Sequence, residues 1–390
     1  MRRRCAALFA LLLSLTLAAC QAAAEVGAWE RLGGVNGSVM LSIAVEPFAR
    51  KLLYVGTSDG RVVRVRVDSR GAAAGPGLPQ ADTTVSVLAP DPAHVGVVYA
   101  GTNRGLYVSS DYGDSWRARG NGLPKDDPPE ALAFGVVSGG AAPLYAGTQQ
   151  HGAYVSHDGG ATWTAFGAGL PASANIYSLA LDATTGTLLA ALTAGAGVYA
   201  LPTAGQRWVA RGVGLPAGAD VFALAAVAGA ASGASATLYA GTSVGVFASA
   251  DHGATWRAAG LPGARVLALA ADPVVPGALY AGTDSTVYRS PDGAAWSEVA
   301  PGIAGHVPAL AVVADAHQHA VVFAGTNSIL RYPALPGGGS DTLGNVLGLL
   351  IFVALGGAVF YLFRRSLRHL RATEARQGAG SLPADRDARN

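Results

Sequence analysis

The sequence is poor in cysteine, methionine and charge. It holds two cysteines, two methionines and only 13% charged residues in 390. Both cysteines, Cys5 and Cys20, lie within the first 20 residues. The rest of the chain therefore has no internal disulfide, and its stability must come from packing and hydrogen bonding. The scarcity of charge also argues against long exposed helices, which need Glu and Lys on their solvated faces.

A basic nucleic-acid-binding face is missing too. The net charge of +2 hides a segregation, because residues 21–342 carry −5 and residues 364–390 carry +4. Nucleic-acid binding requires a basic surface, so a mildly acidic main domain argues against that class of partner. The sequence also has no phosphate-binding P-loop motif.

Glycine is abundant, with 53 residues, and a short motif of the type Leu-Tyr-Ala-Gly-Thr recurs. Its seven copies occupy residues 53–57, 98–102, 144–148, 189–193, 238–242, 279–283 and 322–326. They are spaced 41 to 49 residues apart. A period of about 40–50 residues with several strands per repeat is typical of a β-propeller.

Each repeat divides into four strand-like segments, which in the third repeat are 131–134, 143–148, 152–156 and 163–166. The sequence thus predicts an all-β fold, a seven-bladed propeller of four-stranded blades over residues 26–332. The seventh repeat, 307–332, has only three such segments. The segment that begins at Trp29 is similar to the fourth strand that begins at Trp116, so we expect this N-terminal strand to close the ring and remove its open edge.

A second motif, Ser-x-Asp-x-Gly-x-Ser/Thr-Trp, separates the third and fourth strands at 109–116, 156–163 and 249–256. A shortened form occupies 290–296, the fourth repeat keeps only Gly205 and Trp208, and the first repeat lacks it. The motif resembles the Asp-box, or BNR repeat, of sialidases, some glycosidases, sorting receptors and a photosystem II assembly factor. The resemblance implies a fold and not a reaction. We expect structural roles in the turn for Asp111, Trp116, Asp158, Trp163, Asp251, Trp256, Asp292 and Trp296.

The opposite face collects the second-to-third turns and the blade-to-blade links, and it is called the link face below. Its polar residues suit a protein or glycan ligand, and Lys125, Glu130 and Asp220 lie in the same links. The binding candidates are Asp59, Arg61, Asn103, Arg104, Asp126, Asp127, Gln149, Gln150, His151, Asp284 and Asn327. No cofactor or metal is expected, although His317 and His319 with Asp315 form the one cluster that could suggest a metal.

Two functions remain open at this stage. The main hypothesis is a non-catalytic binding or scaffold module, and the alternative is a membrane-bound glycoside hydrolase. A glycosidase needs two carboxylates about 5–9.5 Å apart, and nothing in the sequence selects such a pair among the acids of the link face. Sialidases are six-bladed rings with an arginine triad, and this chain, with seven repeats and chiefly Arg61 and Arg104 on that face, does not match them.

The two ends predict export and membrane attachment. Residues 1–20 read as a signal peptide, in which 17–20 resemble a lipobox with Cys20 as the lipidation site. Ordinary cleavage near 22–24 is the alternative. The segment 343–363 is long and apolar enough to form one transmembrane helix. A flexible linker is expected before it, at 333–342. The arginine-rich tail, 364–390, then lies in the cytoplasm of a bacterium. Because both ends leave from the Asp-box face, we expect that face to look toward the membrane and the link face to look outward.

Overall fold

The computed structural model describes residues 28–335, apart from 34–36, 50, 70, 81–82, 139–141, 204, 206, 229–235 and 304. Lipidation at Cys20, the signal peptide (1–20), the transmembrane segment (343–363), the tail (364–390) and most of the linker (333–342) fall outside these residues. All the regular elements of the described part are β-strands. None of its elements is a helix that could span a membrane.

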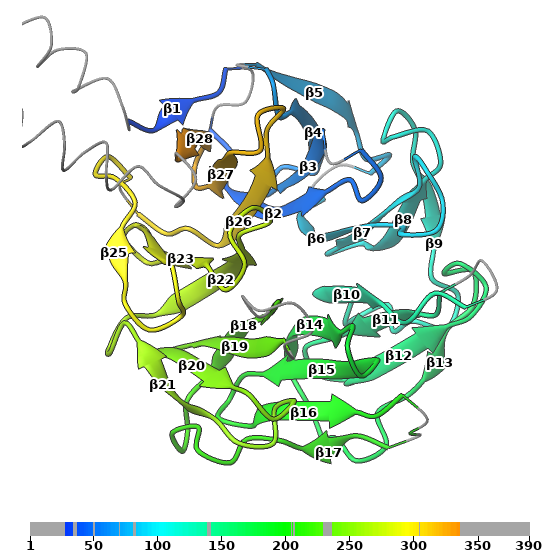
Figure 1. Ribbon diagram of the computed structural model, residues 1–390. Coiled ribbons are helices and arrows are strands. Elements are labelled where there is room, and N and C mark those ends of the chain that lie inside the picture. Colours follow the sequence, from blue (N-terminus) through cyan, green and yellow to red (C-terminus); the bar gives the residue numbers. More distant parts are fainter. Residues whose placement is uncertain are drawn as a thin grey trace, which may run out of the picture. The chain divides into compact units, whose positions relative to one another are not determined.

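The described strands form seven antiparallel sheets of four strands, arranged around a central axis (Figure 1). Blade 1 contains β2 (Met40–Val45), β3 (Leu52–Thr57), β4 (Arg61–Arg66) and β5 (Ala72–Gly77). Blade 2 contains β6 (Val85–Pro90), β7 (Val98–Thr102), β8 (Gly105–Ser109) and β9 (Arg117–Arg119). Blade 3 contains β10 (Ala131–Phe134), β11 (Leu144–Gly147), β12 (Ala153–Ser156) and β13 (Thr164–Ala165). Blade 4 contains β14 (Ile176–Asp182), β15 (Thr187–Leu192), β16 (Gly197–Leu201) and β17 (Val209–Ala210).

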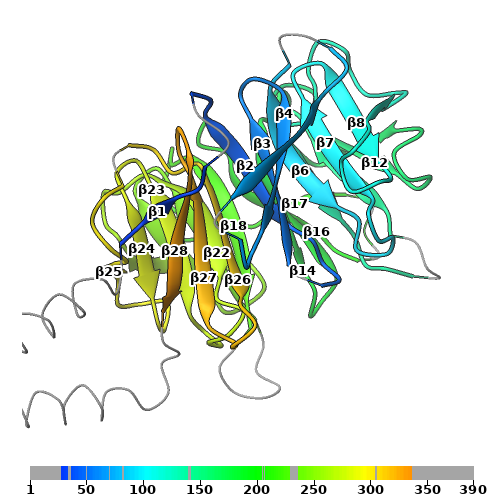
Figure 2. The same ribbon diagram turned by 90° about the horizontal axis from the view of Figure 1, so that it is seen from above.

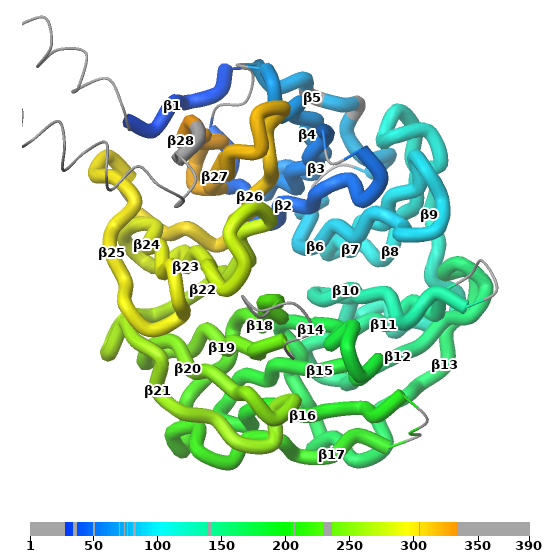
Figure 3. The backbone as a smooth tube through the Cα atoms, in the orientation of Figure 1, coloured from blue at the N-terminus to red at the C-terminus, as the bar shows by residue number. Residues whose placement is uncertain are grey.

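The last three blades continue the same order, and the tube in Figure 3 follows the chain through them. Blade 5 contains β18 (Val221–Val227), β19 (Thr237–Thr242), β20 (Gly245–Ser249) and β21 (Arg257–Gly260). Blade 6 contains β22 (Val266–Ala271), β23 (Leu279–Thr283), β24 (Val287–Ser290) and β25 (Ser297–Glu298). Blade 7 contains β26 (Ala309–Ala314), β27 (Ala320–Gly325), β28 (Ile329–Leu335) and the N-terminal β1 (Glu30–Arg31).

The N-terminal strand closes the ring, as the sequence predicts. β1 pairs antiparallel with β28, with Glu30 opposite Arg331 and Arg31 opposite Leu330. Arg331 also donates a hydrogen bond from Nη1 to the Glu30 carboxylate at 3.1 Å. Figure 2 shows β1 beside β28, followed by β27 and β26. The prediction of seven four-stranded blades, the last completed by the chain's first strand, is confirmed.

The core is divided among the seven interfaces between neighbouring blades. Each interface buries one cluster of aliphatic and aromatic side chains, for example Ala89, Leu106 and Trp163 between blades 2 and 3. The cluster between blades 7 and 1 contains Met40, Val55 and Phe323, so the closing interface is packed like the others. This burial of apolar surface is the main stabilising term in a chain with no disulfide in the propeller.

A Gly-Leu-Pro link also ties one blade to the next. Val213, just before this link in blade 4, accepts the backbone N–H of Trp256 of blade 5 at 2.8 Å. Gly214 follows with φ +91°, and its Cα lies so close to the Trp256 carbonyl that a Cβ would collide with it. In the same way, the backbone carbonyl of Asn121 accepts the N–H of Trp163, and that of Ala168 accepts the N–H of Trp208, both at 2.8 Å.

Candidate functional site

The link face is held together by hydrogen bonds between each second-to-third turn and the link beside it. The threonine that ends the repeated motif fixes the turn itself, since the Thr57 hydroxyl donates to Arg61 O at 2.9 Å and the Thr242 hydroxyl donates to Gly245 O at 2.8 Å. In blade 5, the N–H of Ser243 donates to Asp220 O at 3.0 Å. The repeated motif therefore positions the turns of this face.

Asp127, one of the predicted binding residues, is buried and used within the fold. Its carboxylate accepts the N–H groups of Gln149, Gln150 and His151 at 2.8–3.0 Å and lies 2.9 Å from His151 Nδ1. Burial alone would raise the pKa of Asp127, but these hydrogen bonds outweigh it and hold the pKa below its usual value. Asp127 therefore fixes the 149–151 turn and leaves the exposed Gln150 side chain to face solvent.

The other predicted candidates divide into paired and exposed residues. Asp59 binds Arg61, with Oδ2 at 2.6 Å from Nη2, and Asn103 accepts the N–H of Thr84 at 2.7 Å. Asp284 lies 2.8 Å from Nδ1 of His306. Asn327 is exposed and accepts the Thr326 hydroxyl at 3.3 Å, and Arg104 and Asp126 are exposed as well. The predicted residues thus lie on several blades, and Asp59, Asp127 and Asp284 each bind a residue of a nearby turn or link. They are not gathered into one cluster.

A central channel opens in the middle of the link face. The first strands of all seven blades line a cavity of about 310 Å³. At the start of each of these strands, one residue occupies an equivalent position on the cavity wall. The seven residues are Leu41, Ser86, Glu130, Tyr177, Phe222, Leu267 and Pro308.

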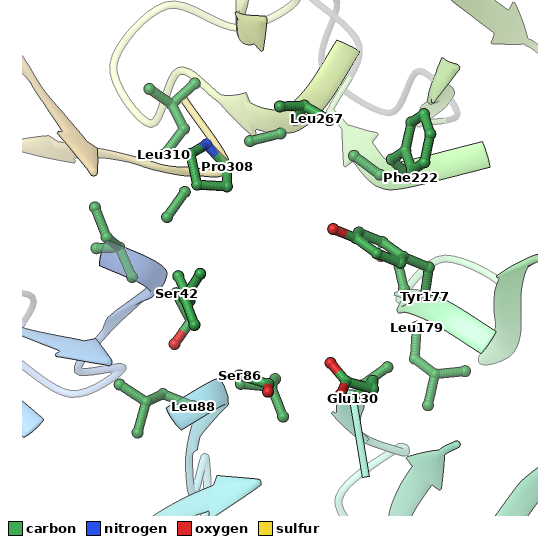
Figure 4. Close-up of a pocket in the computed structure, with 18 of the residues that line it drawn as sticks. Ser42, Ser86, Leu88, Glu130, Tyr177, Leu179, Phe222, Leu267, Pro308 and Leu310 are labelled. Atoms are coloured by element: carbon green, nitrogen blue, oxygen red, sulfur yellow. The ribbon is translucent and has the colours of Figure 1, made fainter. Parts of the chain in front are cut away.

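A β-bulge aims most of these residues into the channel. The pairing register shifts around Tyr177 between Ile176 and Ser178, and around Phe222 between Val221 and Ala223. Blades 1, 2 and 6 have the same shift. A bulge leaves one residue unpaired and redirects its side chain, and bulges often occur next to functional sites. Figure 4 shows the Tyr177 hydroxyl and the Glu130 carboxylate directed into the opening.

Blades 3 to 6 place two aromatic rings and two opposite charges at this channel mouth. The Tyr177 and Phe222 rings meet edge to face, with centroids 5.4 Å apart. The Arg265 guanidinium lies 4.7 Å from the Phe222 ring centroid, a cation–π distance. Tyr177 remains 44% exposed, whereas Phe222 is buried. The exposed aromatic surface of the mouth therefore belongs to Tyr177.

Glu130 is half-buried at the same mouth. Burial raises the pKa of Glu130, and hydrogen bonds from Ser86 and Gln149 offset this only in part. Burial also raises the pKa of Tyr177, and the negative charge of Glu130 raises it further. The two groups thus interact electrostatically across the opening.

The Asp-box turns lie on the other face and use their polar atoms internally. Asp251 accepts the Ser249 hydroxyl at 2.7 Å and both the N–H and the hydroxyl of Thr255 at 2.8 and 2.6 Å. Because of these bonds, the pKa of Asp251 is lowered to about 2. Trp256 packs between blades 4 and 5 and donates from Nε1 to Arg211 O at 2.6 Å. Equivalent contacts recur in the boxes of Asp111 and Asp158, and in the shortened box Asp292 accepts two backbone N–H groups.

A search with family models matches the BNR/Asp-box repeat to residues 154–165, which cover most of β12, the turn and β13. The chain is thus a seven-bladed β-propeller that carries Asp-box repeats.

Solved structures share the propeller fold at low sequence identity. The extracellular domain of the putative hybrid two-component system BT4673 from B. thetaiotaomicron matches with a TM-score of 0.62 and 16% identity, over 80% of this chain and 40% of that one. YCF48 bound to D1 peptide matches with a TM-score of 0.58 and 12% identity, over 80% of this chain and 97% of that one. An ancestral GH74 enzyme matches with a TM-score of 0.51 and 22% identity, over 62% of this chain and 35% of that one. No curated protein matches the Asp-box propeller.

The Asp-box propeller has two features that the sequence reading missed. The first is the channel-mouth position, which in blades 1, 2, 4 and 6 lies twelve residues before the repeated motif. Aligning the repeats on that motif would have shown Tyr177 at this position of blade 4. The second is an acid at the end of the first strand, whose carboxylate accepts the N–H groups of the following turn. Its copies are Glu46, Asp91, Asp182, Asp272 and Asp315.

Asp315 illustrates this second role for the Asp-box propeller. Its carboxylate accepts the N–H groups of His317 and His319, both at 2.8 Å. The cluster that could suggest a metal is therefore a capped turn. The described residues contain no group of three or more His, Cys, Asp or Glu side chains that could hold a metal ion.

Proposed function

We propose that this Asp-box propeller is a non-catalytic binding module that takes a protein segment on its link face. The observation that carries the proposal is the channel mouth, where an open cavity meets the exposed Tyr177 ring and two opposite charges, Glu130 and Arg265. Its volume of about 310 Å³ lies at the lower end of the range of roughly 300–1,000 Å³ for ligand pockets. A mouth of this size suits one inserted side chain, with the surrounding turns contacting the rest of a peptide.

The neighbouring structures support a peptide over a glycan. YCF48, a propeller of similar length, binds a D1 peptide, and the BT4673 propeller belongs to an extracellular domain. Asp127 of the link face holds a turn through three backbone N–H groups and is therefore not free to act in hydrolysis. This use of an acid is expected of a scaffold protein more than of a hydrolase. We therefore favour a protein segment as the ligand of the mouth.

The proposal places the propeller on the outer side of a bacterial cytoplasmic membrane. This rests on the predictions from the sequence of a signal peptide, a lipidation site at Cys20 and one transmembrane helix at 343–363. The Asp-box face exposes apolar residues in the first-to-second turns of its first three blades, namely Phe48, Val95 and Val136. The link face also exposes apolar residues, Val39 and Val244, so the proposed orientation rests on the predicted exit of both chain ends from the Asp-box face.

Site-specific photocrosslinking tests the binding function. Tyr177 on the link face and Tyr112 in an Asp-box turn are almost equally exposed, at 44% and 43%. Each is replaced in the full-length chain by a photoreactive phenylalanine and irradiated in cells. The proposal expects a discrete protein adduct at position 177 and none at position 112. Adducts at 112 alone, or at both positions equally, would show that the link face is not the binding face.

One observation favours the glycosidase alternative. Glu130 is a carboxyl group with a raised pKa beside an aromatic ring, as a general acid in a sugar-binding site would be. Asp127, the acid that contributes to this pKa, is occupied by three backbone N–H groups and is a poor second carboxylate. A panel of polysaccharides and aryl glycosides decides the matter. Turnover by the wild-type chain that disappears in Glu130→Gln would replace the binding proposal with the enzymatic one.

A further inference from the structure

Glu130 is a carboxylate on which no cation of the described residues acts. It lies at the junction between the link of blade 3 and β10, and its backbone N–H donates to Gly147 O at 2.9 Å. The polar side chains that lower its pKa, Ser86 and Gln149, are uncharged, and the one charged group that acts on it, Asp127, is another acid. None of the ion pairs found among the described residues includes Glu130. Half-burying a carboxylate without a cation costs free energy, which a charged ligand can recover.

The opposite side of the mouth already holds a cation. Arg265 covers the face of Phe222, and the positive charge of Arg265 lowers the pKa of Tyr177 while the negative charge of Glu130 raises it. Tyr177 lies between Glu130 and Phe222, the ring that Arg265 covers (Figure 4). A second cation would be repelled on the side of Arg265 and attracted on the side of Glu130. The mouth therefore has one place for an incoming positive charge, between Glu130 and Tyr177.

We propose that the channel mouth receives the side chain of a lysine or arginine from the bound protein segment. Its charge lies against the Glu130 carboxylate, and its aliphatic stem packs on the exposed ring of Tyr177. Lysine and arginine bury their stems along apolar surface while the charged end finds polar partners. The carboxylate, the Ser86 hydroxyl and the aromatic ring supply the three kinds of contact that such a side chain uses.

The inference rests on the proposed peptide-binding function and narrows it. A flat apolar patch would accept many segments, whereas a single half-buried carboxylate in an opening of about 310 Å³ selects for one basic side chain. Arg265 strengthens the selection, because it repels a segment with several adjacent positive charges. The expected ligand is therefore a segment with one basic residue flanked by neutral or acidic ones.

Selection from a random library of displayed twelve-residue peptides tests the inference with the purified full-length chain. Enriched peptides are expected to share a Lys or Arg at one fixed position. For a selected peptide, Glu130→Gln should weaken binding about tenfold or more, as should replacement of the basic residue by norleucine. The two changes together should weaken binding no further than either alone, because they remove the same interaction. The norleucine peptide keeps the test valid even if Glu130→Gln disturbs the fold.

Asp68→Asn provides the matched control. It removes the same charge from an exposed residue in the third-to-fourth turn of blade 1, on the other face, and it should change the affinity less than about twofold. Selected peptides with no shared basic position, or with equal affinity for Glu130→Gln and wild type, would overturn the inference and leave peptide binding intact. Failure to enrich any peptide, or equal binding of the peptides to wild type and Tyr177→Ala, would instead overturn the proposed function.

Discussion

Trp29 donates a hydrogen bond from Nε1 to the carbonyl of Ala300 at 3.2 Å, across 271 residues of sequence. Trp208, Trp256 and Trp296 each make the same bond, to a carbonyl at or next to the fourth strand of the preceding blade, at 2.6–2.7 Å. Trp29 therefore ties blade 7 to the preceding blade, as Trp208, Trp256 and Trp296 do for blades 4, 5 and 6. The chain's first strand is an ordinary member of the ring.

Replacing Trp29 should lower the free energy of unfolding, because it removes a contact that closes the ring. Trp29→Phe keeps a ring beside Tyr332, whose centroid lies 5.3 Å away, and loses only the hydrogen bond, at a cost of about 1 kcal/mol. Trp29→Ala also loses the ring and should cost about 3 kcal/mol. Chemical unfolding of the full-length chain measures both. Equal stability of Trp29→Ala and wild type would show that β1 does not close the fold.

The link glycines should differ in their tolerance of a methyl group. Gly214 and Gly218 both have positive φ, at +91° and +77°, so alanine at either position costs about 1 kcal/mol or more in backbone strain. A Cβ at Gly214 would in addition collide with the Trp256 carbonyl, whereas a Cβ at Gly218 would meet no atom within 4 Å. Gly214→Ala should therefore be less stable than Gly218→Ala by about 1–3 kcal/mol. Thermal unfolding of the two variants side by side tests this, and equal losses would contradict the tight link.

The Asp-box acids should make the propeller sensitive to acid. Hydrogen bonds lower the pKa of Asp111 and Asp251 to about 2. The unfolded chain has a higher pKa near 3.9, so the contribution of these acids is fully present above that value. It is lost as the pH falls from about 4 toward 2. Asp251→Asn should flatten the pH dependence of stability in that window. An unchanged slope for Asp251→Asn would contradict the role given to the box.

Cysteine labelling should report which face looks outward. Since residues 21–390 contain no cysteine, a single introduced cysteine gives an unambiguous signal. Gln150→Cys lies in an exposed turn of the link face, and Ala294→Cys lies in an exposed Asp-box turn. With a membrane-impermeant maleimide on spheroplasts, labelling at 150 should exceed labelling at 294. The reverse order would mean that the Asp-box face looks outward.

Most of the fold could be predicted from the sequence, because its signals are local and repeated. The period of the Gly-Thr motif counts the blades, and the likeness between the segments that begin at Trp29 and Trp116 locates the closing strand. The repeated motif reflects turns and pairings that the chain forms within about 45 residues. The pairing of β1 with β28 joins the two ends of the propeller, and only the likeness of its sequence to a fourth strand reveals it.

The candidate site was harder to predict because it depends on contacts between blades. In the sequence Asp127 resembles an acid available for binding, yet in the fold its carboxylate accepts the backbone N–H groups of the 149–151 turn. Tyr177 reads as an ordinary strand residue, and only the bulge in β14 turns it into the channel. The meeting of Glu130, Tyr177 and Arg265 arises from three different blades, and no local pattern reveals it.

The central claim is that a protein segment binds at the channel mouth, and a hydrogen-exchange footprint tests it most directly. The measurement compares the full-length chain alone and with a peptide selected as above. The account predicts slower exchange at the starts of β10, β14 and β18 and in the 149–151 turn. Slower exchange confined to the Asp-box turns at 109–116, 156–163 and 249–256 would contradict it.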